Sequence, residues 1–223
     1  MPQHYVEGWA YGAGGSLIVG TLITNDGGYF GFDHAALWQG SSHTFTDLNP
    51  AGFAFSEAYA VRGTAQAGYA FSSTTNSYHA VLWHGTATSA VDLTPSTVSN
   101  AYATGLGQRS EVGSGRPTGM SVNHALLWHG TAASMVDLHP ASFTDSCARA
   151  ALGNVQVGYG HISANALHAL LWKGSAKTAV DLQQYLPNTF TSSEAYAIDT
   201  SGAILGSAYS TSTVTWHAVV WVP

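Results

Sequence analysis

The stretch His124-Ala125-Leu126-Leu127-Trp128, with Asp137-Leu138 downstream of it, decides the fold of this chain because the whole pattern recurs. His-Ala-x-x-Trp occurs five times, and its histidines are 45, 45, 44 and 49 residues apart. These histidines are His34, His79, His124, His168 and His217. After the first four, an Asp-Leu pair begins thirteen residues later, at Asp47, Asp92, Asp137 and Asp181. A long, regular repeat predicts similar units stacked on one another.

Each unit contains two more short elements of alternating polarity, which indicates strands rather than helices. One is small-aromatic-small, as in Ala58-Tyr59-Ala60, and the other is an apolar run ending in Gly-Tyr, as in Gln66–Tyr69. Four short strands in about 45 residues are typical of a propeller blade. We therefore predict an all-β chain, a five-bladed β-propeller of four-stranded repeats in one domain over residues 1–223. The expected repeats are 9–48, 49–93, 94–138, 139–182 and 183–223.

The fifth repeat lacks an Asp-Leu strand, which leaves the closure of the ring open. Residues 2–8 are one candidate for the missing outer strand, with Val6-Glu7 standing in for Val91-Asp92. Only four residues separate Glu7 from Tyr11. At about 3.4 Å per residue they barely span three strand spacings of about 4.8 Å. A three-stranded last blade and a longer array cut short are the alternatives.

These residues together resemble the HAF-type extracellular repeat family of bacteria, named for a His-Ala-Phe core with Trp and Asp-Leu downstream. The resemblance covers about residues 9–222. The Phe position differs, because it holds Ala36, Val81, Leu126, Leu170 and Val219. The resemblance implies an extracellular repeat protein and no defined activity.

The amino-acid composition excludes some classes of protein function. Charged residues are 8% of the chain and the net charge is −6, whereas hydrophobic residues reach 45%. Such a chain is not disordered, and its six cations make no basic surface for nucleic acid. Cys147 is the single cysteine, so no internal disulfide forms. We expect no membrane span, since no apolar run reaches about 18 residues. The first residues lack a signal-peptide pattern, and the extracellular expectation rests on composition and the resemblance.

The histidine and aspartate of each repeat should share one face of a hairpin, with His34 directly opposite Asp47. The same holds for His79 with Asp92, His124 with Asp137, and His168 with Asp181. A catalytic or metal-binding pair is the alternative to a structural hydrogen bond. We favour the structural role, because active sites are normally single whereas contacts that hold a fold recur. Histidines on the third strand stand too far from the axis to share one metal at about 2.1 Å. We predict no metal, no cofactor and no catalytic residue.

Candidate ligand-binding residues lie on the innermost strand and in the loops before each histidine. The former are Tyr11, Tyr59, Tyr102, Tyr196, Glu57 and Glu194, and the latter include Tyr78 and Trp216. Aligned by motif, the counterparts of the two glutamates are Asn100 and Cys147. We predict a non-catalytic extracellular binding or adhesion module with glycans as the favoured ligand and a protein surface as another partner. A glycoside hydrolase using the two glutamates and a structural spacer within a larger surface protein are the alternatives.

Overall fold

The computed structural model describes residues 5–24, 33–40, 44–163 and 166–223. The predicted all-β class is confirmed: in these residues 19 strands form five antiparallel sheets. The first sheet contains β1 (Tyr5–Gly14), β2 (Leu17–Thr24), β3 (Asp33–Gln39) and β4 (Phe45–Asp47). The second contains β5 (Phe55–Arg62), β6 (Ala65–Ser72), β7 (Ser77–Trp83) and β8 (Val91–Asp92).

The third sheet contains β9 (Val98–Leu106), β10 (Glu111–Pro117), β11 (His124–Trp128) and β12 (Val136–Asp137). The fourth contains β13 (Asp145–Leu152), β14 (Val155–Ser163), β15 (Ala166–Trp172) and β16 (Val180–Asp181). The fifth contains only β17 (Phe190–Ile198), β18 (Ile204–Ser210) and β19 (Thr215–Trp221). Four short 3-10 turns complete the described elements: η1 (Ala87–Ser89), η2 (Ala132–Ser134), η3 (Ala176–Thr178) and η4 (Leu182–Tyr185).

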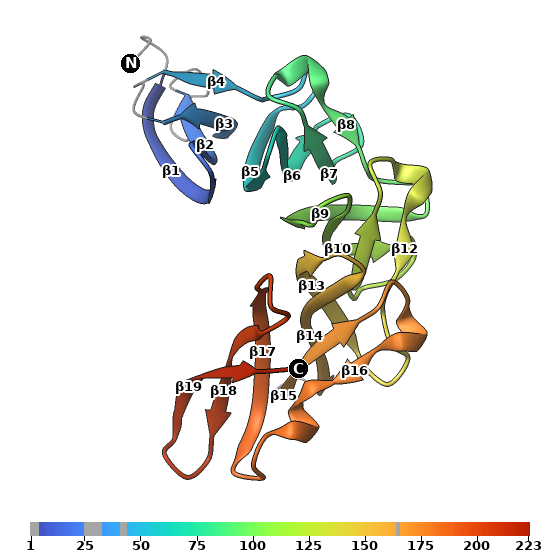
Figure 1. Ribbon diagram of the computed structural model, residues 1–223. Helices are drawn as coiled ribbons and strands as arrows, with labels where there is room; N and C mark the ends of the chain where they lie inside the picture. The colour runs from blue at the N-terminus through green and yellow to red at the C-terminus, as the bar shows by residue number, and fades with distance from the viewer. Residues whose placement is uncertain (1–4, 25–32, 41–43, 164–165) are drawn as a thin grey trace.

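Strands within a sheet pair in chain order, and the sheets follow one another along an open arc (Figure 1). The first strands face the hollow of the arc, and the short fourth strands lie on its outer side. Over the described residues the arc does not close into the expected ring, because the first and last sheets lie at its two ends.

The expected closing strand is not formed by the described part of residues 2–8. Tyr5 and Glu7 belong to β1, where they pair with Thr24 and Ile23 of β2. Residues 2–4 lie outside the described residues. Because Glu7 continues directly into the inner strand of the first sheet, it cannot also form the outer edge of the fifth. The last sheet has three strands, one of the alternatives that the sequence left open.

A bulge in every first strand explains the glycine of every second strand. The pairing skips one residue after the alanine, at Tyr11, Tyr59, Thr104, Arg149 and Tyr196. The bulge brings a main-chain carbonyl of the first strand against the glycine opposite. A Cβ there would overlap this oxygen, so the position requires glycine. The five glycines are Gly20, Gly68, Gly113, Gly158 and Gly206.

The core lies between sheets rather than in one centre. Each junction buries the alanine that follows the histidine, together with the leucine of Asp-Leu, against the alanine and tryptophan of the next sheet. Trp83, Trp128 and Trp172 are fully buried in these junctions. The repeat tryptophans of these three sheets therefore pack between sheets.

Candidate functional site

The repeated His-Asp contact is present in all four predicted pairs. The distance from histidine Nδ1 to aspartate Oδ2 is 2.8 Å for His34–Asp47 and 2.7 Å for His79–Asp92, His124–Asp137 and His168–Asp181. The predicted register is wrong by two residues, since Asp47 pairs with Ala36 and not with His34. The aspartate reaches its histidine diagonally along one face.

The aspartate also fixes the turn that follows it. Oδ1 of Asp92 accepts a hydrogen bond from the Thr94 main-chain N–H at 2.8 Å. The same bond runs from Asn49, His139 and Gln183 to the aspartate two residues before each. Both carboxylate oxygens are therefore used for structure. In the described residues, His217 has no such aspartate, because its sheet lacks the fourth strand, and its Nε2 lies 2.6 Å from Thr213 Oγ1.

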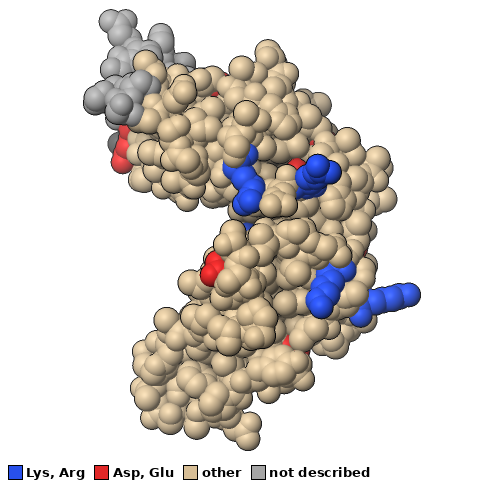
Figure 2. Space-filling model, viewed as in Figure 1, with Lys and Arg blue, Asp and Glu red and all other residues tan. Residues whose placement is uncertain are grey.

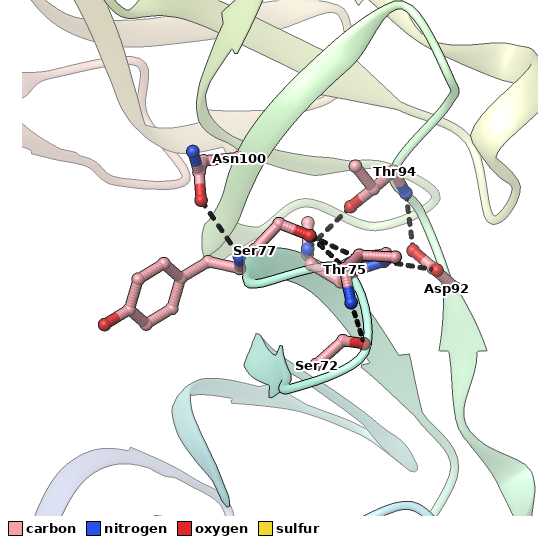
Figure 3. A network of polar contacts seen from close by, with 9 residues as sticks. Ser72, Thr75, Ser77, Asp92, Thr94 and Asn100 are labelled. Carbon is pink, nitrogen blue, oxygen red and sulfur yellow. Dashed lines mark hydrogen bonds and ion pairs between the residues drawn. The ribbon is translucent and has the colours of Figure 1, made fainter. Parts of the chain in front are cut away.

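Figure 3 shows how this contact continues into the loop of the second sheet. His79 Nε2 lies 3.0 Å from Ser77 Oγ, and Thr94 Oγ1 accepts the Ala80 N–H at 2.9 Å. From the neighbouring sheet, Asn100 Oδ1 accepts the Tyr78 N–H at 2.9 Å. The pair thus helps to fix the main chain at Tyr78, a predicted site residue.

A tyrosine cluster surrounds one carboxylate on the first three sheets. Glu57 Oε1 accepts a hydrogen bond from the Tyr69 hydroxyl at 2.6 Å, and Oε2 accepts one from Tyr59 at 2.8 Å. We define the tyrosine cluster as Glu57 with Tyr11, Tyr59, Tyr69, Tyr78 and Tyr102. Ring centroids of neighbouring members lie between 5.2 Å (Tyr11–Tyr59) and 5.8 Å (Tyr59–Tyr69). The rings form a continuous aromatic surface around an acceptor.

Burial raises the pKa of four phenols of the cluster, those of Tyr11, Tyr59, Tyr69 and Tyr102. Burial is the main cause at Tyr59 and Tyr69, and the hydrogen bond to Glu57 adds to it. Burial also raises the pKa of Tyr102. These phenols stay protonated at neutral pH and therefore donate hydrogen bonds. Tyr11 is 45% exposed, so the cluster is open to solvent at its first member.

A second group, the arginine cluster, contains Arg149, Tyr159, Glu194 and Tyr196 on the last two sheets. The Arg149 guanidinium lies 3.3 Å from Glu194 Oε2. It also covers the Tyr159 and Tyr196 rings at 5.0 and 5.4 Å from their centroids. Burial, with the Cys147 thiol nearby, raises the pKa of Tyr159 to about 12.

The structure divides the predicted site residues into three places. Tyr11, Tyr59, Tyr78, Tyr102 and Glu57 lie in the tyrosine cluster. Glu194 and Tyr196 lie in the arginine cluster. Trp216 stands apart against Tyr209, with a centroid distance of 5.8 Å.

Sequence reasoning missed three members of these clusters: Tyr69, Tyr159 and Arg149. Tyr69 pairs directly with Glu57 across β5 and β6, and Tyr159 pairs with Cys147 across β13 and β14. The Gly-Tyr dipeptide was the available signal, since its tyrosine follows the glycine opposite the bulge.

The motif alignment of the third repeat is also wrong by two residues. Tyr102 pairs with Ser114, as Glu57 pairs with Tyr69, so the counterpart of Glu57 is Tyr102 and not Asn100. The longer hairpin around Gly107–Ser110 moves the third repeat's bulge to Thr104. Tyr102 consequently points to the tyrosine cluster instead of taking the bulge position.

A separate cleft of about 680 Å³ lies between the turns of the second and third sheets. Arg62, His84, Arg109 and His129 line it together with the buried Glu111. Glu111 Oε2 accepts the Gly130 N–H at 2.8 Å, and burial raises the pKa of this carboxyl. None of the tyrosine cluster lines the cleft.

Two further facts concern metals and membranes. Within the described residues, no three His, Cys, Asp or Glu side chains gather closely enough to hold a metal ion. The described part of the chain also contains no helix with the length and apolar character needed to cross a membrane.

Comparisons with known proteins find similar structures but no similar sequence family. No protein-family model matches the chain, and no curated protein matches it. A similar solved structure is that of PorZ, described as an essential bacterial surface component of the type-IX secretion system of the human oral-microbiomic Porphyromonas gingivalis. The TM-score is 0.43 and the identity 9%, over 98% of this chain and 29% of PorZ. The chain thus spans less than a third of that protein, and a likeness at this level assigns no function.

Proposed function

We propose that this chain is a propeller-type binding module that holds carbohydrate on the tyrosine cluster. The observation that carries the proposal is the group of five neighbouring rings beside the Glu57 carboxylate, in which Tyr69 is buried and Tyr11 is nearly half exposed. Sugars stack their apolar C–H faces on aromatic rings and donate hydroxyl hydrogens to carboxylates. The first three sheets position these groups on rigid strands.

The arrangement supports binding more than hydrolysis. A glycosidase needs two carboxyl groups about 5 to 9.5 Å apart across one bond. Glu57 lies in the second sheet and Glu194 in the fifth, with two sheets between them. Glu57 accepts two phenol hydrogen bonds, and Glu194 is paired with Arg149.

Binding is tested with a glycan array followed by calorimetry on the sugars that bind. Tyr11→Ala removes an exposed ring from the tyrosine cluster, and Tyr185→Ala removes a more exposed ring from η4, outside it. Loss of one stacked ring should weaken binding about tenfold, or about 1.4 kcal/mol. Equal affinity of the two variants, or an array without hits, would refute carbohydrate binding at this place.

Hydrolysis is tested separately with Glu57→Gln combined with Glu194→Gln. Any glycosidase activity of the parent chain that survives in this double variant excludes the two carboxylates as its catalytic pair. Activity that disappears while the unfolding temperature is kept would instead support the hydrolase alternative.

We also infer that the chain is an extracellular bacterial repeat protein of the HAF type. Five ordered copies of the motif and the rarity of charged side chains support this. A tagged copy expressed in its own bacterium should be found outside the cytoplasm, and a cytoplasmic copy would contradict the inference. A structural spacer would also be extracellular, but its variants would show no ligand.

A further inference from the structure

The four junctions between sheets use the same two faces throughout. We call the face of a sheet that packs on the next sheet its forward face. It consists of the residue before the glycine of the second strand and the alanine after the histidine of the third strand. These residues are Val19, Ala67, Val112 and Val157 with Ala35, Ala80, Ala125 and Ala169, and all are fully buried. We call the face of the next sheet that receives this contact its backward face. It consists of the tryptophan and of the alanine before the bulge, which is Ala58, Ala103, Ala148 or Ala195.

The last sheet has a forward face that no other described residues cover, although it lacks the leucine that an Asp-Leu strand supplies in the other sheets. Its residues at the equivalent positions are Leu205 and Ala218, and Val220 stands where Leu127 stands in the third sheet. Leu205 is 45% exposed and Val220 is 58% exposed, whereas Leu127 is 1% exposed. Ala218 is exposed as well. An apolar face that is buried in four sheets is thus open in the fifth.

The first sheet has the matching backward face, which is also open. Ala10 is exposed, although its counterparts in the other sheets are fully buried. Ile18 is 37% exposed, whereas Ile204, at the same place in the last sheet, is 4% exposed. Trp38 is only half-buried.

The two end sheets contain no lysine or arginine, and their charged residues are carboxylates. All six Lys and Arg residues lie between Arg62 and Lys177, so residues of the first and last sheets include none. Figure 2 shows the cations over the middle of the arc on the viewed face. Two apolar faces without cations can meet without burying an unpaired positive charge.

We propose that two copies of this chain associate head to tail, with the forward face of one copy's last sheet against the backward face of its partner's first sheet. The contact reproduces the part of the four internal junctions that the second and third strands of the forward face provide. Because the two faces differ, one contact leaves the backward face of the first copy and the forward face of its partner free. A pair therefore closes into a ring by a second such contact or extends by adding copies. This interface is independent of the proposed carbohydrate site.

The test measures molar mass by light scattering during size-exclusion chromatography over a range of concentrations. Val220→Lys blocks the forward face, and Ile18→Lys blocks the backward face. The parent chain should exceed 23.3 kDa, whereas each variant alone should be monomeric at the same concentration. A mixture of the two variants keeps one intact pair of faces. It should form a pair of twice that mass and nothing larger.

Val214→Lys is the control, since Val214 is 71% exposed in the turn between β18 and β19 and lies off the forward face. It should associate as the parent does. Unfolding temperatures equal to the parent's would show that the lysines do not disrupt the fold. A monomeric parent chain, or variants that associate like the parent, or a mixture that stays monomeric, would overturn the proposal.

Discussion

Leu127→Ala measures how strongly one junction between sheets holds the arc together. Leu127 is 1% exposed on β11 and packs with Val112 and Leu138 of its own sheet against Ala148 and Leu170 of the next. The substitution removes three carbon groups, worth about 2.4 kcal/mol at about 0.8 kcal/mol each. The cavity left behind adds to this, so we expect a loss of about 3 to 4 kcal/mol in the free energy of unfolding.

Val220→Ala is the matched control, because Val220 occupies the same position in the last sheet with 58% exposure. Its loss should be below about 0.5 kcal/mol, as for most surface changes. Urea unfolding followed by circular dichroism and tryptophan fluorescence gives both values, at a concentration where the chain is monomeric. Similar losses for the two variants would refute the equivalence of their positions and the inter-sheet core described above.

Three other predictions follow from single groups. Gly113→Ala should cost more than about 2 kcal/mol in unfolding free energy, since the new Cβ meets a fixed carbonyl oxygen; an unchanged urea midpoint would contradict the bulge geometry. Glu111→Gln should stabilise the chain at pH 7, and Gln156→Glu, at the equivalent place in the fourth sheet, should destabilise it. Burial raises the pKa of Glu111, so the parent chain loses stability as pH rises through the ordinary titration range of a carboxyl group. The difference in unfolding free energy between the parent and Glu111→Gln should therefore vanish below about pH 4. In an absorbance titration Tyr59 and Tyr69 should ionise last, after Tyr159 near pH 12, and stability should fall above about pH 10, where only the unfolded chain loses these protons.

Local pairing could be predicted from the sequence because each repeat encodes it. The spacing from His124 to Asp137 predicted their contact, and the missing Asp-Leu allowed a three-stranded last sheet. Ring closure could not be predicted in the same way. It depends on the rotation between neighbouring sheets, which results from many packed side chains and has no motif of its own.

The binding cluster could be predicted only in part for a related reason. Tyr11 and Tyr59 follow the small-aromatic-small pattern, and they are neighbours in the structure. Tyr102 has the same pattern but a register shifted by two residues, because a longer hairpin precedes Glu111. Tyr69 comes from a different element, and only its cross-strand pairing with Glu57 reveals it. An alignment of the motif by residue type alone does not reveal a register shift that the position of the bulge accommodates.

The repeated faces at the junctions between sheets have a consequence for how such a gene can change in length. The four junctions use residues of the same kind, since Ala35 and Ala169 both meet an alanine and a tryptophan of the next sheet. A duplication or deletion of one whole unit would therefore leave each remaining junction matched. The third unit already tolerates a longer hairpin without losing its contacts to either side. Unequal recombination can thus lengthen or shorten this protein by whole sheets while its hydrophobic contacts stay intact.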